Sequence, residues 1–332
     1  MFPSAKFYTG FLQLLLACTL SVSFTHIEAN ENNKIEPIYP IPKNIEVNTA
    51  KADIGEQLFF DTRLSRDNSI ACATCHQLDT GGDDNLAKGI SISGESQLFN
   101  TPSIFNALYN FRQNWAGSIK TPQEQIDDVV SSQNGFDNQW QNIISLLSTD
   151  KQLTTDFKQV YSDGINKTNI IDALVEFEKT LITPNSRFDR YLRNEDNALS
   201  RKEIEGYVIF KELGCISCHQ GINIGGNLFQ KFGVFYDYMA ERGNLSKHDY
   251  GRFNTTNRLI DQFVFKVPSL RNVAVTAPYL HDGSAKTLDD AISIMGRTQI
   301  GRTLTMDEVL SIKAFLITLT GEYKNTPLDG RS

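Results

Sequence analysis

The chain has 332 residues, a length typical of two modest domains. Its 40% hydrophobic and 21% charged residues describe an ordinary soluble globular body. The formal net charge of −7 gives no electrostatic support for a nucleic-acid-binding protein.

The N-terminus has the pattern of a secretory signal. A lysine precedes an apolar run over residues 7–24 that is interrupted only by small polar residues. Its flanks favour a cleaved signal over a stable membrane span, and we expect residues 1–29 to be removed. Residues 15–18 (LLAC) also resemble a lipoprotein box, so Cys18 is either discarded with the signal or becomes a lipid anchor. In both cases the mature chain is exported, and we expect it in the periplasm.

The next segment, residues 30–51, is polar and contains several prolines. This composition predicts an extended leader that runs over a surface and forms no domain of its own. Beyond it, no apolar run of the sequence is long enough to span a membrane.

A predicted helix with Ile54, Leu58 and Phe59 on one face precedes a cysteine–histidine motif. The chain reads CATCH from Cys72 to His76. Cys-x-x-Cys-His is the attachment signature of c-type haem. The two thiols bond to the porphyrin vinyl groups, and the histidine becomes the proximal ligand of the iron. The motif therefore predicts one covalent haem.

The same arrangement recurs later in the chain. Ile204, Tyr207 and Val208 mark a second amphipathic helix, and CISCH follows from Cys215 to His219. A lone Cys-x-x-Cys also occurs in zinc half-sites and redox dithiols. Here both pairs carry the adjoining histidine, so haem is the favoured interpretation, and we expect two haem c groups. The attachment residues would be Cys72, Cys75, Cys215 and Cys218, with His76 and His219 as proximal ligands.

Between the two motifs, hydrophobic spacing predicts a helix over residues 170–181. Its inward face would carry Ile170, Ile171, Leu174, Phe177 and Leu181.

Two capped helices are predicted near the C-terminus. One begins after Thr287 and holds Ile292 and Met295. The other opens with a capping box at residues 305–308 and would end at Gly321. Its inward residues would be Leu310, Phe315 and Leu319.

Helix, haem motif, loop and helix thus occur twice, while alternating strand patterns are scarce. We predict a mainly α protein with two cytochrome c-like haem domains and long loops. The N-terminal domain would cover residues 52–195 and the C-terminal domain residues 196–325. The boundary falls in the polar, charged stretch near residues 185–201.

Over nearly all of its mature length the chain resembles the bacterial dihaem cytochrome c peroxidase and MauG superfamily. The resemblance rests on short segments that occur in the family's order with near-family spacing. They are GEQLFFD at 55–61, LSRD at 64–67, NTPS at 100–103, NALYN at 106–110, WAG at 115–117, QGINIGG at 220–226, GRF at 251–253, VPSLRN at 267–272, TAPYLHDG at 276–283 and MG at 295–296.

The resemblance implies different roles for the two haems. Peroxide would react at the N-terminal haem, held by His76. Electrons would enter at the C-terminal haem, held by His219 with Met295 as its sixth ligand. A thioether ligand raises the reduction potential, which suits a site that accepts and relays electrons. Periodicity alone would make Met295 a core residue. MauG has tyrosine at this position, so Met295 favours the peroxidase branch.

Further site residues follow from the same resemblance. Trp115 would lie between the haems as an electron bridge, a place where it would also serve as core packing. Gln125 matches the family's pocket glutamine. Asn100, Thr276 and Pro278 match the ligands of an interdomain calcium, the last two through backbone carbonyls, and calcium accepts such oxygen donors together with water. Capping and turn formation are the alternative role of this trio.

The predicted peroxide pocket departs from the family pattern. Ile92 stands where a distal histidine is expected, so we expect the first haem to be open to ligands in its oxidised state. Gly135 stands where the pocket glutamate is expected. Asp137, two residues on, is the nearest substitute as general acid/base. Phe99 replaces the arginine that usually precedes Asn100.

The sequence leaves three functions open. The first is a periplasmic peroxidase that reduces hydrogen peroxide with electrons from a small cytochrome c or copper protein. The second is a MauG-like oxidase of a partner protein or another organic substrate, which the missing distal histidine favours. The third is an electron-transfer or sensor protein with weakened peroxidase activity, which the missing glutamate favours. We rank them in this order, and since family members often dimerise, a homodimer is also considered.

Overall fold

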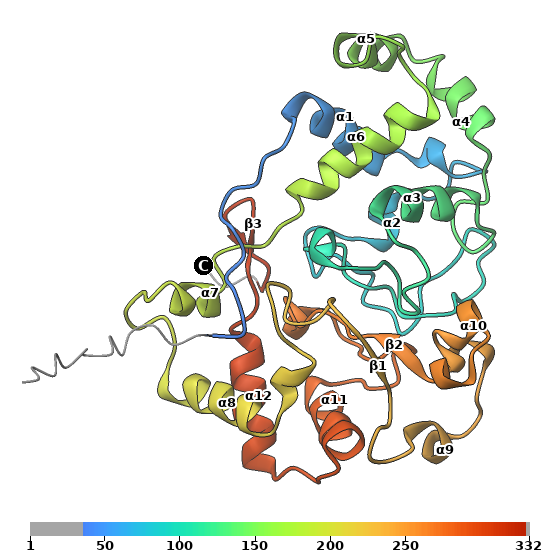
Figure 1. The fold of residues 1–332 in the computed structure, drawn as a ribbon. Coiled ribbons are helices and arrows are strands. Elements are labelled where there is room, and N and C mark those ends of the chain that lie inside the picture. The colour runs from blue at the N-terminus through green and yellow to red at the C-terminus, as the bar shows by residue number, and fades with distance from the viewer. Residues whose placement is uncertain (1–35, 330–332) are drawn as a thin grey trace, which may run out of the picture. The chain divides into compact units, whose positions relative to one another are not determined.

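The computed structural model describes residues 36–329. The predictions for the signal, for Cys18 and for the start of the leader lie outside the described residues. The described part is mainly helical, as predicted, with two small two-stranded sheets (Figure 1). The division into two haem domains stays a prediction.

Helices occur along the whole described chain, and strands are short. The longer helices are α1 (Thr49–Phe59), α3 (Pro122–Ser131), α4 (Trp140–Leu147), α5 (Lys151–Val160), α6 (Lys167–Thr180), α8 (Arg201–Glu212), α11 (Leu288–Met295) and α12 (Met306–Ile317). The short helices are α2 (Cys72–Cys75), α7 (Arg187–Leu192), α9 (Tyr238–Arg242) and α10 (Phe253–Thr256). Strand β1 (Phe229–Lys231) pairs antiparallel with β2 (Val264–Lys266), and β3 (Glu322–Tyr323) with β4 (Thr326–Pro327).

Two helix pairs organise the fold. Helix α1 packs on α6, and α8 packs on α12 (Figure 1). A glycine lies at each crossing. A Cβ atom on Gly55 would lie 2.0 Å from the carbonyl oxygen of Ala173, and one on Gly206 would lie 1.9 Å from that of Ser311. Only glycine allows these close approaches, so the chain builds the same crossing twice.

The first hydrophobic core lies around α1 and α6. All the apolar side chains predicted to face inward from these two helices are buried, which confirms both amphipathic patterns. They are Ile54, Leu58, Phe59, Ile170, Ile171, Leu174, Phe177 and Leu181.

The second core lies around α8, α11 and α12. Tyr207 and Phe315 are fully buried there, with ring centroids 5.0 Å apart. The prediction that Ile204 and Val208 also face inward is wrong, because their residues are 37% and 40% exposed. Close approach at the glycine of α8 turns that glycine and Tyr207 toward α12, and this rotates the two aliphatic residues outward.

The predicted N-caps of the two helices near the C-terminus of the chain are both confirmed. Thr287 and Thr305 each form a capping box with the third residue of the helix that follows. Helix α12 ends at Ile317, earlier than the predicted stop at Gly321. Leu310, predicted to face inward, is 36% exposed, whereas the other two predicted inward residues are buried.

The described part of the leader is extended but is not confined to the surface. Ile38 and Ile41 are each only 1% exposed. The backbone N–H of Gly221 donates to the Pro37 carbonyl at 2.9 Å, and the N–H of Ile41 donates to Asp189 Oδ1 at 3.2 Å. These contacts tie the leader to the second half of the chain.

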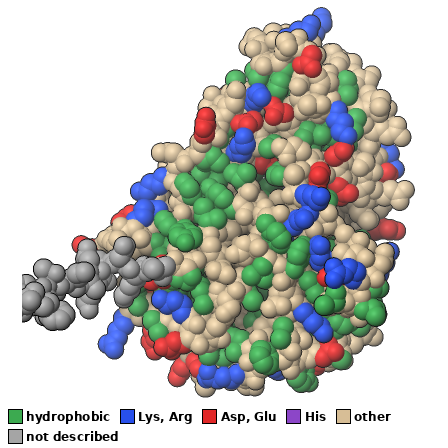
Figure 2. Space-filling view, viewed as in Figure 1, with side chains coloured by type: hydrophobic (Ala, Val, Ile, Leu, Met, Phe, Trp, Pro, Cys, Tyr) green, Lys and Arg blue, Asp and Glu red, His purple; other side chains and the backbone are tan. Residues whose placement is uncertain are grey.

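Within residues 36–329, no helix combines the length and the apolar character that crossing a bilayer requires. Figure 2 shows acidic and basic side chains interspersed on the face in view, with hydrophobic side chains between them. On this face the charge is distributed and not gathered in a field of one sign.

Candidate haem sites and the residues between them

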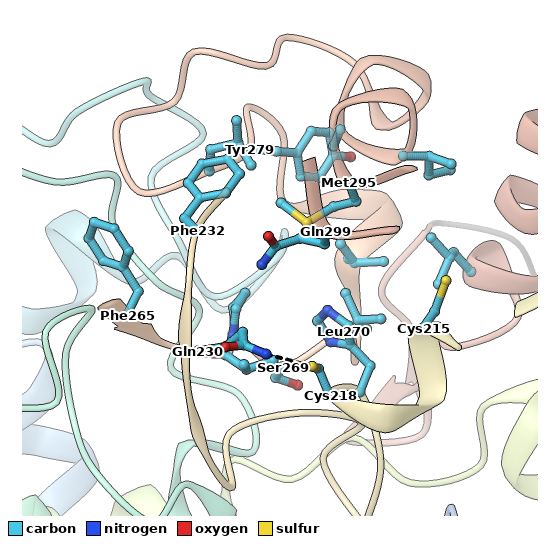
Figure 3. Close-up of a pocket in the computed structure, with 18 of the residues that line it drawn as sticks. Cys215, Cys218, Gln230, Phe232, Phe265, Ser269, Leu270, Tyr279, Met295 and Gln299 are labelled. Atoms are coloured by element: carbon cyan, nitrogen blue, oxygen red, sulfur yellow. Dashed lines mark hydrogen bonds between the residues drawn. The ribbon is translucent and has the colours of Figure 1, made fainter. Parts of the chain in front are cut away.

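A large cavity lies beside the second Cys-x-x-Cys-His motif. Its volume is 620 Å³, within the range of about 300–1,000 Å³ typical of ligand sites. Cys215, Cys218, His219 and Met295 all line it, and the rest of the wall is mostly apolar. In Figure 3 the Met295 sulfur points into the cavity from one side, and Cys218 lies on the opposite side. This places two thiols, an imidazole and a thioether around one space.

The imidazole of His219 is fixed for ligation. Its Nδ1 donates to the carbonyl oxygen of Ile224 at 3.2 Å, an interaction that orients the ring as in histidines that bind a metal through Nε2. Burial lowers the pKa of His219 to about 4, so the ring is neutral and its Nε2 lone pair is available. An apolar cavity with this donor set fits haem c.

The first motif has the same local design. Cys72 to Cys75 form the short helix α2, and His76 follows as its C-cap. Its Nδ1 donates to the Gly82 carbonyl oxygen at 3.0 Å, and burial lowers the pKa of His76. Burial raises the pKa of Cys72 to about 12 and that of Cys75 to about 11, so both thiols are neutral.

Met295 is the last residue of α11 and is followed by a π-helical turn, Gly296–Ile300. Such turns are rare and are often found at functional sites. In this turn Gln299 accepts the N–H groups of Gly233 and Val234 at 2.9 and 3.0 Å. The turn therefore fixes the loop that passes Met295 and borders the same cavity.

Trp115 lies on the wall of the cavity. Its indole Nε1 donates to the Asn100 carbonyl oxygen at 2.8 Å, and its ring makes an edge contact with His281 at a centroid distance of 6.5 Å. The backbone N–H of Asn100 in turn donates to the His281 carbonyl at 2.8 Å. The indole is thus held rigidly between the loop that follows the first motif and the second half of the chain.

The three residues of the predicted calcium site, Asn100, Thr276 and Pro278, line this cavity as well. The Asn100 amide donates to the Leu86 carbonyl at 2.9 Å, and the Thr276 hydroxyl donates to the Val273 carbonyl at 3.4 Å. These bonds leave oxygen atoms of the trio available, and the calcium site remains a prediction.

The residues predicted for the peroxide pocket near the first motif, Gln125, Gly135 and Asp137, do not line this cavity. The side-chain oxygen Oε1 of Gln125, on α3, is buried and has no partner among residues 36–329. Asp137 has a left-handed backbone and forms an ion pair with Arg66. Gly135 lies in a tight turn after α3, where a Cβ atom would be 2.1 Å from the Val129 carbonyl oxygen. Because of this clash, Gly135 has no room for a side chain, and the expected glutamate cannot simply be restored there.

Sequence reasoning missed Glu178 on α6. Burial raises its pKa to about 8, and its charge contributes to the raised pKa of the Cys72 thiol nearby. Glu178 lies one helical turn after Leu174, on the inward face of α6. A carboxyl group on the apolar face of a predicted helix is the sequence signal that could have revealed Glu178.

A second group that was missed surrounds His281. Its Nε2–H donates to Asp249 Oδ1 at 2.7 Å, and Arg242 forms ion pairs with both Asp249 and Asp282. The two carboxylates and the imidazole lie close enough to hold a metal ion. Arg242 already forms ion pairs with both carboxylates, so the cluster is better described as a buried charge network next to Trp115.

Together, the mainly helical fold and two Cys-x-x-Cys-His motifs, each with its histidine fixed through Nδ1, define a c-type cytochrome. The chain belongs to the di-haem cytochrome c peroxidase family, whose model matches residues 49–197. Membership in this family implies haem c as the cofactor.

Relatives along the whole chain agree with this assignment. A cytochrome c peroxidase Ccp of Escherichia coli is 42% identical over 87% of this chain, which spans 62% of that protein's length. The cytochrome c551 peroxidase of Nitrosomonas europaea is 39% identical over 95% of this chain and 92% of its own. A solved MauG-like protein associated with microbial copper homeostasis has a TM-score of 0.75 at 25% identity, covering 86% of this chain and 93% of its own. The family is thus one of peroxidases, which are oxidoreductases.

Proposed function

We propose that this chain is an exported dihaem cytochrome c peroxidase. It reduces hydrogen peroxide to two water molecules, taking up two electrons and two protons. The observation that carries the proposal is the pair of half-buried, neutral imidazoles of His76 and His219, each next to two cysteines and each held through Nδ1 by a backbone carbonyl. Relatives named cytochrome c peroxidases along nearly the whole chain support the same reaction.

The two sites take different roles in this proposal. When bound, haem c supplies the redox-active iron at each motif. Met295 shares the cavity of His219, so these two side chains would hold the haem iron of this site, which would relay electrons. The His76 site would bind peroxide, because Ile92 stands where a blocking histidine is expected. The corresponding domains are residues 52–195 and 196–325.

Trp115 provides the route between the two sites. Its indole borders the second cavity, and its backbone and ring are tied to both halves of the chain. We assign it as the electron bridge, because a rigid aromatic ring in this position shortens the gap that electrons must cross.

Protons for the reduction come from groups around the first motif. Asp137 and Gln125 are the proposed pocket residues, and the unpaired Oε1 of Gln125 can hold a water molecule. Glu178 is a third proton-carrying group, since its pKa of about 8 keeps it largely protonated at neutral pH. Calcium at Asn100, Thr276 and Pro278 would hold the loop that contains Asn100, whose carbonyl oxygen accepts the hydrogen bond of the Trp115 indole.

The cellular setting follows from the signal-like N-terminus. The chain would act in the periplasm, free or lipid-anchored at Cys18, with electrons from a small cytochrome c or copper protein. A homodimer is the proposed assembly.

The proposal is tested by counting haems and measuring turnover. Mass spectrometry of the exported chain should show two covalently bound haem groups, and reduced donor should be consumed when peroxide is added. The double variant Cys215→Ser/Cys218→Ser should retain one haem and lose donor-linked turnover. A chain with bound zinc and no haem would refute the proposal.

A MauG-like oxidase is the second candidate, favoured by Ile92 in place of the expected histidine and by the likeness to a solved MauG-like protein. Such an enzyme would store the two oxidising equivalents of peroxide until a protein or organic substrate arrives. Mixing the oxidised protein with peroxide without a donor separates the two functions. Long persistence of the oxidised haem spectrum would favour the oxidase, and rapid decay the peroxidase.

A further inference from the structure

Lys266 occupies an unusual position in the wall of the second cavity. It is the last residue of β2, opposite Phe229 of β1, and is only 6% exposed. Its backbone N–H donates to the Trp115 carbonyl oxygen at 2.9 Å. The strand pairing and this bond fix the backbone, while the side chain borders the cavity.

The ammonium group of Lys266 has no counter-ion among residues 36–329. Among the described residues, no hydrogen bond or ion pair reaches its side chain, and no aspartate or glutamate lines the cavity. Desolvation alone accounts for its altered acidity and lowers the pKa of Lys266 to about 8. A buried cation without a partner is costly, so an anionic group in the cavity would stabilise the charged form of Lys266.

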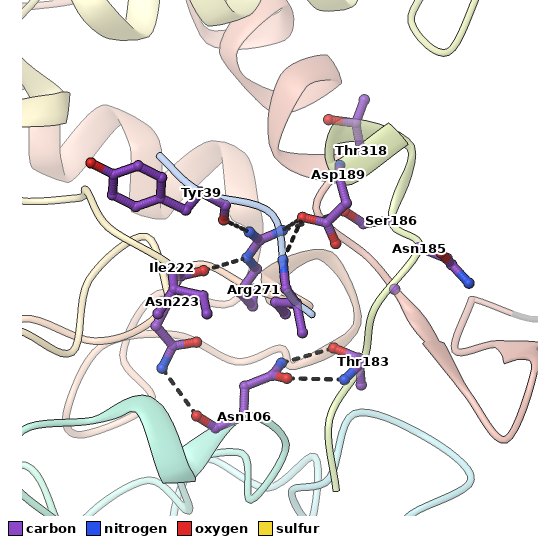
Figure 4. A network of polar contacts seen from close by, with 12 residues as sticks. Tyr39, Asn106, Thr183, Asn185, Ser186, Asp189, Ile222, Asn223, Arg271 and Thr318 are labelled. Atoms are coloured by element: carbon purple, nitrogen blue, oxygen red, sulfur yellow. Dashed lines mark hydrogen bonds and ion pairs between the residues drawn. The ribbon is translucent and has the colours of Figure 1, made fainter. Parts of the chain in front are cut away.

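Arg271, the other cation of the cavity wall, already has a carboxylate partner in the protein. Its guanidinium forms an ion pair with Asp189 at 2.7 Å and donates to the carbonyl oxygens of Tyr39 at 2.9 Å and Ile222 at 3.0 Å (Figure 4). Arg271 is therefore already paired with a carboxylate, and Lys266 is the cation of the cavity wall that has no such partner among the described residues.

We propose that the Lys266 ammonium is the counter-ion of a propionate of the haem attached at Cys215 and Cys218, and that it raises the reduction potential of this haem. The inference rests on the proposed function, because it requires haem at the second motif. The propionates are the anionic substituents of haem c, and a lysine binds a carboxylate as a compact point charge. A fixed positive charge beside the haem stabilises the reduced state, which carries one positive charge less.

The test measures both reduction potentials of the holoprotein by spectroelectrochemistry. Lys266→Met should shift the potential of the second haem downward and leave that of the first unchanged. Lys266→Arg, which keeps the charge, should stay close to the wild type. Lys231→Met is the matched control, because Lys231 lies on the paired strand β1 but is exposed, and it should shift neither potential. Equal potentials for Lys266→Met and the wild type would overturn the proposal.

A vibrational measurement keeps the inference testable even where Lys266→Met fails to fold. The propionate bending bands in the resonance Raman spectrum report the hydrogen bonds of each propionate. Lys266→Arg should move one band of the second haem, and Lys231→Met should move none. An unmoved band in Lys266→Arg would show that the propionates do not contact this side chain. Absence of haem from the second motif would instead refute the proposed function, so the two failures are distinguishable.

Discussion

Trp115 and His281 occupy equivalent places in two similar loops, and their rings touch edge to face with centroids 6.5 Å apart. Each residue lies two positions after the start of a β-bridge, and each is followed two residues later by a glycine with positive φ. The bridges are Gln113–Ile119 and Tyr279–Ala285, and the glycines are Gly117 and Gly283.

The equivalence extends to the residues that precede these loops. Asn106 and Asn272 share the same left-handed conformation, with φ 61° and ψ 12°. Their backbone N–H groups donate to Leu181 and Leu319, respectively, each in the segment directly after a core helix. The first of the two similar loops presents the indole of Trp115, and the second presents the imidazole of His281. The contact between Trp115 and His281 therefore joins the two similar loops.

Met295→His should lower the reduction potential of the second haem and leave it low-spin, because an imidazole replaces a thioether as axial ligand. Spectroelectrochemistry measures the potential, and the ferric spectrum reports the spin state. Met306→His, at an exposed position on α12, is the control. An unchanged potential in Met295→His would show that Met295 is only a packing residue.

The oxidised wild type should already contain one high-spin haem, since Ile92 replaces the expected blocking histidine. It should bind cyanide without prior reduction, and electron paramagnetic resonance should count one high-spin and one low-spin iron. A fully low-spin spectrum would mean that another group occupies the free face at His76.

Asp137→Asn should lower the kcat for peroxide reduction, by up to the roughly 10²–10⁴-fold typical of a general acid/base. Stopped-flow and steady-state kinetics measure the loss. Gly135→Glu is not a useful gain-of-function test, because its Cβ would clash with the Val129 carbonyl. Asp163→Asn, on an exposed turn, serves as the matched control. An unchanged rate in Asp137→Asn would move the proton-donor role to Glu178 or to water bound at Gln125.

The stability of the protein should depend on pH through Glu178. Its pKa is raised by burial from 4.5 to about 8, so the folded state holds this proton more tightly than the unfolded state. The resulting stabilisation is fully present below pH 4.5 and is lost as the pH rises through about 8. Urea unfolding of wild type and Glu178→Gln at several pH values measures the difference. The variant's relative stability should increase with pH, and parallel curves would contradict the prediction.

Arg271→Met should destabilise the fold by about 3–5 kcal/mol, because it leaves the buried Asp189 carboxylate unpaired. The side chains of Arg271 and Asp189 are only 1% and 0% exposed. The exposed pair Lys324–Glu56 provides the comparison, and Lys324→Met should cost about 0–1 kcal/mol. Denaturant unfolding measures the free energy of unfolding of both variants. Equal losses of stability would show that burial does not make the Arg271–Asp189 pair more costly to break than the exposed pair.

Local patterns made much of the molecule predictable. The helix caps at Thr287 and Thr305 and the apolar face of α6 follow from residues a few positions apart, and the structure confirms them. The outward turn of Ile204 and Val208 was not predictable, because it depends on how closely α8 approaches α12 at Gly206. The end of α12 at Ile317 likewise differs from the glycine signal at Gly321.

The sequence by itself predicted haem c, since the attachment signature consists of two cysteines and a histidine within five consecutive residues, as from Cys72 to His76. Only the tertiary structure decided which groups surround that chemistry. Three features depend on segments that lie far apart in the chain. They are the uncompensated charge of Lys266, the desolvated carboxyl of Glu178 and the contact of Trp115 with His281. Burial and pairing are properties of packed neighbours, and a local pattern cannot specify them.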